Sequence, residues 1–180
     1  APRVLSRGLP NTSLAAMLSR RAWNNVIYWT TGKFAENVAV SAYEIEGGMM
    51  LYYTPALKQL SQSYEARGID VAVDEVVRLS RYCASRNMTL LVVLIPDKEQ
   101  VYWDSLCVPC REQGRVIPSC LNYVEQRLRG ENVSVVNLLA PFEASARQGV
   151  LLYWRDDTHW NAEGLGIAVE SVMPELQKLL

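Results

Sequence analysis

The sequence contains a single histidine, His159, within the stretch YWRDDTHWNAEG. Asp156 and Asp157 precede this histidine, and Trp154 and Trp160 flank it. A carboxylate two residues before an imidazole can accept the Nδ1–H hydrogen bond within a bent loop, which leaves Nε2 free to take a proton from a serine. A general base with an orienting acid is therefore one interpretation of this pattern. The competing interpretation is a structural histidine that caps a helix or fills a polar niche.

Short apolar runs alternate with longer stretches of helical periodicity, which is typical of a parallel sheet with helices on both faces. The run TLLVVLIP is almost continuously apolar, as expected for a strand that is covered on both sides. We predict an α/β three-layer sandwich with a central parallel sheet of about five strands, in a single domain over residues 1–180. The predicted strands are 3–6, 25–31, 49–55, 89–96 and 133–139, and the predicted helices are 12–23, 33–46, 69–86, 117–130 and 161–179.

The histidine motif falls at a functional edge of such a sheet. In open parallel sheets, functional groups gather in the loops that follow the carboxyl ends of the strands. DDTHWNAEG follows the last predicted strand and opens the final helix. Asn161 is predicted to cap that helix, with Gly164 in its first turn. The side chains predicted to face the sheet are Leu165, Ala168, Val169 and Val172.

Composition argues against several classes of function. The chain has 180 residues, of which 49% are hydrophobic and 21% charged, with a net charge of −1, as in an ordinary globular protein. Without clustered Lys and Arg, we expect no nucleic-acid partner. No apolar run approaches the roughly 20 residues that cross a bilayer, so we expect no membrane span. The sequence shows no signal peptide, although a mature chain starting at APR is what removal of one would leave.

Three of the four cysteines crowd the segment CVPCREQGRVIPSC, at Cys107, Cys110 and Cys120. A zinc site would need a fourth ligand nearby, and the only histidine is far off in sequence, so we expect no metal. A redox Cys-x-x-Cys would open a helix after a strand, whereas this one interrupts a loop. We predict that Cys107 or Cys110 pairs with Cys120, and that Cys83 is free and buried. Such a disulfide favours an oxidising compartment; a cytosolic protein with free thiols is the alternative.

DTHWNAEG, preceded about sixty residues earlier by LLVVLIPDKEQVYW, resembles the alginate O-acetyltransferase branch of the SGNH (GDSL-type) hydrolase superfamily. The resemblance covers roughly the C-terminal half, and the N-terminal half agrees only in its alternation of predicted strands and helices. It implies an SGNH hydrolase-like (flavodoxin-like) fold in which Asp157 and His159 serve a serine nucleophile. The Asp-x-x-His spacing of the broader superfamily would select Asp156 as the acid instead.

The nucleophile is less clearly marked. The superfamily usually shows Gly-Asp-Ser or Gly-Thr-Ser after its first strand, and this sequence has neither. Ser6 ends the first predicted strand. Ser13, which we prefer, lies in GLPNTSLAAML at the start of the first helix, where backbone amides can form part of an oxyanion hole; it is also an ordinary N-cap residue type. Some relatives place the serine after the Asp-x-His motif. Here the only serine after the motif is Ser171, which lies within a predicted helix. If this chain has the same order as those relatives, the catalytic serine is therefore absent from it.

Four further residues are candidates for contacts with substrate. Gly32, in WTTGKF, occupies the place of an oxyanion glycine in the superfamily, or is a turn glycine. Lys98, in PDKEQ, either binds a carboxylated sugar or caps a strand end. Trp154 and Trp160 either stack on a sugar ring or fill the core.

Two functions from different classes follow. The first is a serine-dependent O-acetyltransferase or O-acetylesterase without a cofactor, acting in the periplasm or outside the cell. Its substrate would be a cell-envelope or extracellular polysaccharide or an acylated sugar, and an acyl-donor protein is a further candidate partner. The alternative is a non-catalytic module on the same fold that binds polysaccharide or a partner protein, as the missing Gly-Asp-Ser signature suggests. A serine Oγ within hydrogen-bond reach of His159 distinguishes the two.

Overall fold

The computed structural model describes residues 22, 23, 26, 30, 38–53, 66–106 and 119–179. The chain divides into two compact units, residues 1–38 and 39–180. In the first unit, Val26 and Thr30 are helical, and Thr30 Oγ1 donates to the Val26 carbonyl at 2.7 Å. The predicted strand 25–31 is therefore wrong at these residues. Their β-branched side chains favour a strand, but a threonine hydroxyl can also bond the carbonyl one helical turn back. The predicted elements 3–6 and most of 12–23 lie outside the described residues.

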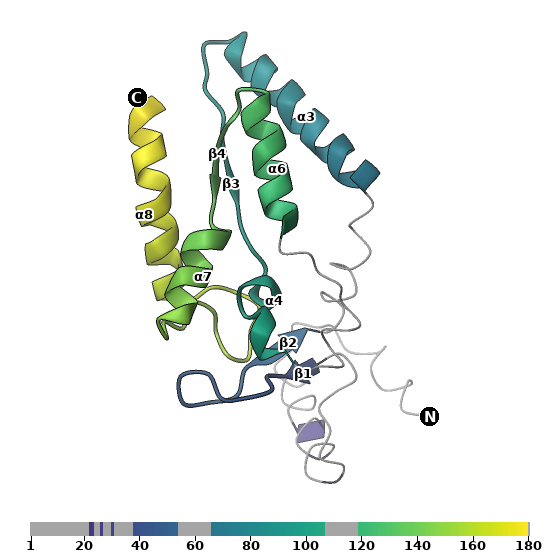
Figure 1. The fold of residues 1–180 in the computed structure, drawn as a ribbon, viewed down its shortest axis with the longest axis vertical. Coiled ribbons are helices and arrows are strands. Elements are labelled where there is room, and N and C mark those ends of the chain that lie inside the picture. Colours follow the sequence, from purple (N-terminus) through teal and green to yellow (C-terminus); the bar gives the residue numbers. More distant parts are fainter. Residues whose placement is uncertain are drawn as a thin grey trace. The chain divides into compact units, whose positions relative to one another are not determined.

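Two parallel strands form the centre of the second unit, with helices on both sides (Figure 1). β3 (Leu91–Leu94) pairs in parallel with β4 (Ser134–Asn137), so that Leu91 lies opposite Ser134. α3 (Ala66–Ala84) and α6 (Ser119–Gly130) cover one face, while α7 (Leu139–Arg147) and α8 (Ala162–Leu179) cover the other.

The two faces of this strand pair are buried in separate clusters, because successive side chains in a strand point to opposite sides. Val92 and Val135 pack with residues of α3 and α6, such as Val77 and Leu128. Leu91, Val93 and Val136 pack towards the opposite cluster, which includes Phe142 of α7 and Ala168 of α8. The chain is therefore α/β and layered around β3 and β4. The described residues do not form the expected sheet of about five strands, since each of their sheets has two strands.

The second small sheet replaces a predicted helix. β1 (Val38–Val40) pairs with β2 (Leu51–Tyr53), and Ser41 N donates to the Met50 carbonyl at 2.8 Å. Glu46 and Gly47 both have positive φ, at 46° and 79°, which is the backbone of a tight hairpin turn. The predicted helix 33–46 is therefore wrong over residues 38–46, where the two glycines of EGG allow the chain to turn back on itself.

The other long elements of the second unit are confirmed with shifted ends. The predicted helices 69–86, 117–130 and 161–179 correspond to α3, α6 and α8, and the predicted strands 89–96 and 133–139 correspond to β3 and β4. The strand 49–55 is confirmed as β2. The stretch KEQVYWDSL after Asp97, which its sequence predicts to be helical, forms α4 (Lys98–Val101) and the 3-10 helix η1 (Trp103–Ser105). Helix α7 was not predicted.

Helix α8 turns a slightly different face to the core than its sequence predicts. Gly164 and Ala168 are buried, and Val172 packs against the core cluster. Leu165 and Val169 are exposed, so the prediction that they face the sheet is wrong. The side chains that face the core are spaced four residues apart, at positions 164, 168 and 172. Leu165 and Val169 each follow one of these positions, which turns them about 100° away around the helix axis.

The predicted disulfide is not formed at Cys120. Cys83 and Cys120 are both free thiols, and both are half-buried rather than buried. Cys107 and Cys110 lie outside the described residues. The two described cysteines therefore give no support for an oxidising compartment.

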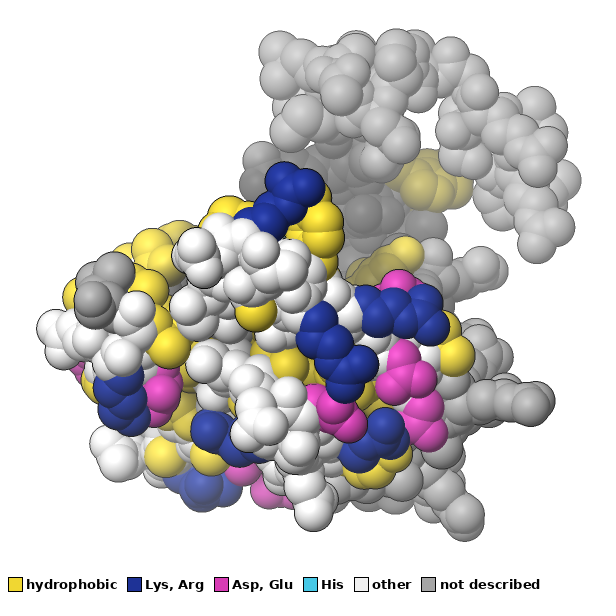
Figure 2. Space-filling model, turned by 90° about the horizontal axis from the view of Figure 1, so that it is seen from above, with side chains coloured by type: hydrophobic (Ala, Val, Ile, Leu, Met, Phe, Trp, Pro, Cys, Tyr) yellow, Lys and Arg dark blue, Asp and Glu magenta, His cyan; other side chains and the backbone are white. Residues whose placement is uncertain are grey.

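The described surface carries charges of both signs. On the face drawn in Figure 2, basic and acidic side chains lie next to one another. Within the described ranges, no helix is long and apolar enough to cross a membrane.

Candidate active site

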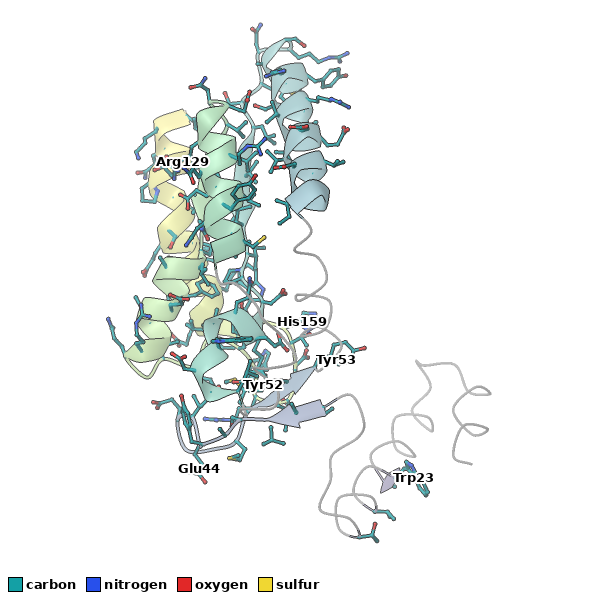
Figure 3. All side chains as sticks on the ribbon, turned by 45° about the vertical axis from the view of Figure 1, so that its right-hand side comes forward. Trp23, Glu44, Tyr52, Tyr53, Arg129 and His159 are labelled. Carbon is teal, nitrogen blue, oxygen red and sulfur yellow. The ribbon has the colours of Figure 1, made fainter. Side chains whose placement is uncertain are left out.

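Residues 154–159 form a closed loop between β4–α7 and α8, here called the histidine loop. Tyr153 and Trp160 form an antiparallel bridge at its base, and Trp154 N donates to the His159 carbonyl at 3.0 Å. Leu51 N of β2 donates to the Arg155 carbonyl at 2.8 Å, which joins the loop to β2, and Figure 3 shows His159 far from Arg129. This end of the unit is where β3 leads into α4 and β4 into α7. The loop therefore lies at the carboxyl ends of the parallel strands, as the sequence predicts.

His159 and Asp157 are in direct contact within the loop. His159 Nδ1 lies 2.6 Å from Asp157 Oδ1, which also accepts the backbone N–H of His159 at 3.2 Å. The hydrogen bond from His159 lowers the pKa of the Asp157 carboxyl, so this group is an anion at neutral pH. A carboxylate only accepts hydrogen bonds, so Nδ1 is the donor and carries the proton. Asp156 makes no such contact, and the geometry selects Asp157 as the partner of His159.

The opposite nitrogen of the imidazole is accessible. The His159 side chain is 80% exposed, and none of the described residues hydrogen-bonds Nε2. An imidazole whose Nδ1–H is held by a carboxylate, with Nε2 open, can accept a proton from a hydroxyl group and later return it. The pair is thus arranged as a general base and its orienting acid.

The start of α8 fixes the end of the histidine loop. Asn161 Oδ1 accepts the backbone N–H of Gly164 at 3.0 Å, which confirms the predicted cap. Asn161 Nδ2 also donates to the Leu151 carbonyl at 2.6 Å, which ties the helix start to the incoming chain. The backbone passes so close here that a Cβ on Gly164 would clash with the Leu152 carbonyl oxygen and lie 3.1 Å from the Trp160 Cβ.

Replacing Gly164 with alanine should therefore destabilise the protein. We expect the free energy of unfolding to fall by about 1–3 kcal/mol, because a backbone atom cannot move aside as a side chain can. Gly166→Ala is the matched control, since nothing lies within 4 Å of a Cβ at that position of the same helix. That variant should be neutral or more stable by up to about 1 kcal/mol. Denaturant unfolding measures both, and equal stability of the two variants would contradict the prediction.

The two tryptophans have different environments. The Trp160 ring is half-buried and packs edge-on against Phe142, with the ring centroids 6.0 Å apart. Trp154 is 54% exposed. Together with Asn161, Ala162 and Leu165 they line an open hollow of about 380 Å³ next to the histidine loop. Trp154 can therefore offer a ring face to a ligand, whereas Trp160 mainly supports the hollow from the core side.

Lys98 lies beneath the loop, not on its surface. Lys98 is only 1% exposed, and its Nζ lies within hydrogen-bond distance of four backbone carbonyls instead of pointing into solvent. A carboxylated sugar cannot reach the ammonium group in this arrangement, which departs from the substrate contact expected from the sequence. Asp97 is the N-cap residue of α4, and its backbone N–H donates to Gln100 Oε1 at 2.8 Å, as in a capping box.

Arg155 is a cation within the histidine loop, and the sequence analysis did not predict a role for it. Its guanidinium donates to the carbonyls of Ile45 and Glu46, and to that of Gly48 at 2.9 Å. It thereby joins the histidine loop to the β1–β2 hairpin. These acceptors are backbone atoms more than 100 positions away in the chain, and nothing in the local sequence indicates them.

The candidate nucleophiles are not among the residues brought together here. Ser13, Ser6 and Gly32 lie outside the described residues. Ser171 lies within α8, and its hydroxyl donates to the Ile167 carbonyl at 2.8 Å. Across residues 38–53, 66–106 and 119–179, no serine hydroxyl hydrogen-bonds His159.

Comparison with known protein families identifies the family of this chain. The family model described as "SGNH hydrolase-like domain, acetyltransferase AlgX" matches residues 51–180. Among solved structures, the chain is similar to the O-acetyltransferase domain of Pseudomonas putida AlgJ, with 21% sequence identity and a TM-score of 0.50. The match covers 79% of this chain and 48% of that one. Bacillus cereus PatB1 with a sulfonyl adduct matches at 14% identity and a TM-score of 0.46, over 72% of this chain and 41% of that one. The chain thus spans about half the length of these proteins, and a search of curated proteins found no match.

Proposed function

Because the chain belongs to the family of SGNH hydrolase-like acetyltransferase AlgX domains, we propose that it takes part in serine-dependent O-acetyl transfer to a polysaccharide. The observation that carries the proposal is the 2.6 Å contact between His159 Nδ1 and Asp157 Oδ1, in an exposed loop at the carboxyl ends of parallel strands. In this arrangement the carboxylate holds Nδ1–H and leaves Nε2 open to take the proton of a hydroxyl nucleophile.

The proposed reaction has two steps. His159 Nε2 takes the proton of the serine hydroxyl while Oγ bonds to the acetyl carbonyl carbon, and the donor's alcohol leaves with that proton. A sugar hydroxyl then gives its proton to Nε2 and attacks the acetyl-serine; the bond to serine Oγ breaks, Oγ takes the proton back from Nε2, and the sugar acetate leaves. Water in place of the sugar makes the same site an esterase. Asp157 stays ionised and holds the imidazole in both steps.

The hollow beside the loop supports a sugar substrate. An exposed tryptophan face next to a polar catalytic loop is suited to stacking on the apolar face of a sugar ring. We propose a cell-envelope or extracellular polysaccharide as the acceptor, which implies a site of action in the periplasm or outside the cell. An acyl-donor protein is the proposed second partner.

A transfer assay tests the proposal. The protein is incubated with 4-nitrophenyl acetate, with and without an oligosaccharide acceptor, and the glycan is analysed by mass spectrometry for added acetyl groups. We expect release of nitrophenol that depends on protein, and acetylated glycan when the acceptor is present. Nitrophenol release without acetylated glycan would favour the esterase; neither product, together with glycan binding, would favour the non-catalytic module. The feature that favours this module is the missing Gly-Asp-Ser signature in the sequence.

Trp154→Ala should weaken use of the glycan without harming the chemistry. We expect the KM for the oligosaccharide to rise about three- to tenfold, the worth of one aromatic contact, while kcat on the small ester stays within about twofold. Trp23→Ala is the matched control, because Trp23 is 56% exposed, close to the 54% of Trp154. Steady-state kinetics on both substrates measure this. An unchanged KM for the glycan in Trp154→Ala would remove Trp154 from the binding site.

A further inference from the structure

The ammonium group of Lys98 lies among four backbone carbonyl oxygens. Three of them come from the histidine loop and one from β2. The Nζ···O distances are 2.8 Å to Leu51, 2.7 Å to Trp154, 3.0 Å to Arg155 and 3.0 Å to Asp157. The group forms no salt bridge with a described carboxylate, and the ring centroid of Tyr52 lies 5.6 Å from Nζ. The charge of Lys98 therefore acts mainly on the backbone of the histidine loop.

Such a cluster of carbonyls requires a compact cation at its centre. Four carbonyl dipoles directed at one point repel each other, and when buried they cannot be satisfied by bulk water. An ammonium group is a point charge with three rotatable donors, whereas the planar fork of an arginine does not fit acceptors from several directions. Burial, with a smaller contribution from Arg155, outweighs the opposing effect of Glu99, Asp156 and Asp157 and lowers the pKa of Lys98 to about 8. At neutral pH the group is therefore still charged.

Asp157 connects this cluster to the catalytic pair. Its backbone carbonyl accepts from Lys98 Nζ, and its side chain accepts from His159 Nδ1. Turning the backbone of this one residue would disturb both contacts. We propose that Lys98 is a positioning residue that holds the histidine loop in the conformation in which the Asp157 carboxylate reaches His159. The predicted effect on turnover rests on the proposed function, but the effect on the imidazole does not.

The single histidine makes a direct test possible, because an ¹⁵N NMR spectrum of the imidazole contains the signals of His159 alone. In the wild type, with a neutral ring, we expect the proton on Nδ1, held by Asp157. Asp157→Ala supplies the reference spectrum of a ring without its partner. In Lys98→Met, which removes every donor at similar volume, the imidazole spectrum should move to that of Asp157→Ala. Turnover of the acetyl ester should fall about 100-fold in kcat with KM within about threefold, since a catalytic group misplaced by 1 Å costs about that much.

Two further variants make the test specific. Lys178→Met removes an exposed lysine that pairs with Glu175 at 2.6 Å, and it should leave the imidazole spectrum and kcat unchanged. Lys98→Gln is a second variant in case Lys98→Met does not fold; it bonds fewer of the carbonyls and should shift the spectrum in the same direction. A folded Lys98→Met with the wild-type imidazole spectrum would overturn the proposal. Failure of both Lys98 variants to fold would also overturn it, because Lys98 would then serve global stability and not the loop. Since the spectrum needs no turnover, it tests Lys98 even if the proposed acetyl transfer is wrong.

Discussion

Replacing His159 with alanine should lower turnover of an activated acetyl ester by a factor on the order of thousands, as loss of a triad member does in serine hydrolases. The chain has no second histidine that could take the serine proton. His159 is largely exposed, so its removal leaves no cavity, and the variant should keep the stability of the wild type. The measurement is kcat/KM on 4-nitrophenyl acetate, with thermal unfolding as the check on folding. Esterase activity of full strength in His159→Ala would make this histidine a structural residue.

The two aspartates provide a matched pair within the same loop. Asp157→Ala should reduce kcat by less than His159→Ala, because the imidazole remains and loses only its orientation and its preferred tautomer. Asp156→Ala removes a neighbouring carboxylate that has no contact with the imidazole and should leave kcat within about threefold of the wild type, the range expected from a nearby charge in solvent. If Asp156→Ala were the more damaging variant, the Asp-x-x-His pairing of the broader superfamily would replace the pairing seen here.

The contact between Asp157 and His159 could be predicted because it is local. Asp157 and His159 lie two positions apart, and a bent loop before a capped helix is enough to bring their side chains together. The amphipathic helices α3 and α6 and the apolar strand β3 were predictable for a similar reason, since each pattern lies within one short segment. The SGNH hydrolase-like fold predicted from DTHW and PDK is likewise confirmed by the family match over residues 51–180.

The role of Lys98 could not be predicted in the same way. Its acceptors are backbone carbonyls, 47 to 59 positions away along the chain, and a carbonyl is present at every residue whatever its type. A lysine next to a catalytic motif therefore suggests a charge for the substrate, until the fold shows that it is buried. The hairpin of β1 and β2 was missed because the helical pattern of 33–46 outweighed the turn signal of Gly47 and Gly48. The turn is also bonded by Arg155, which lies far away in the sequence, so the local pattern does not indicate this contact.

One of Ser13→Ala and Ser6→Ala should lower turnover as much as His159→Ala does. A nucleophile and its base act on the same proton, so the loss of either one removes the same step. A fluorophosphonate probe should label the same serine in the wild type, because it bonds only to an activated hydroxyl, and labelling should disappear in His159→Ala. Ser171→Ala is the control; its hydroxyl bonds Ile167 within α8, and its loss should change neither labelling nor turnover.

The labelled peptide, identified by mass spectrometry, decides the assignment. Label on the peptide that contains Ser13 would confirm the preferred nucleophile, and label on that of Ser6 would replace it. If no serine were labelled and the ester were not turned over, the serine would be absent from this chain, as in relatives that place it after the Asp-x-His motif, or the chain would be a non-catalytic module. If no serine were labelled and turnover survived in His159→Ala, the triad itself would be wrong. Each result is distinct because His159 is the only imidazole in the sequence, and any serine it activates must depend on it.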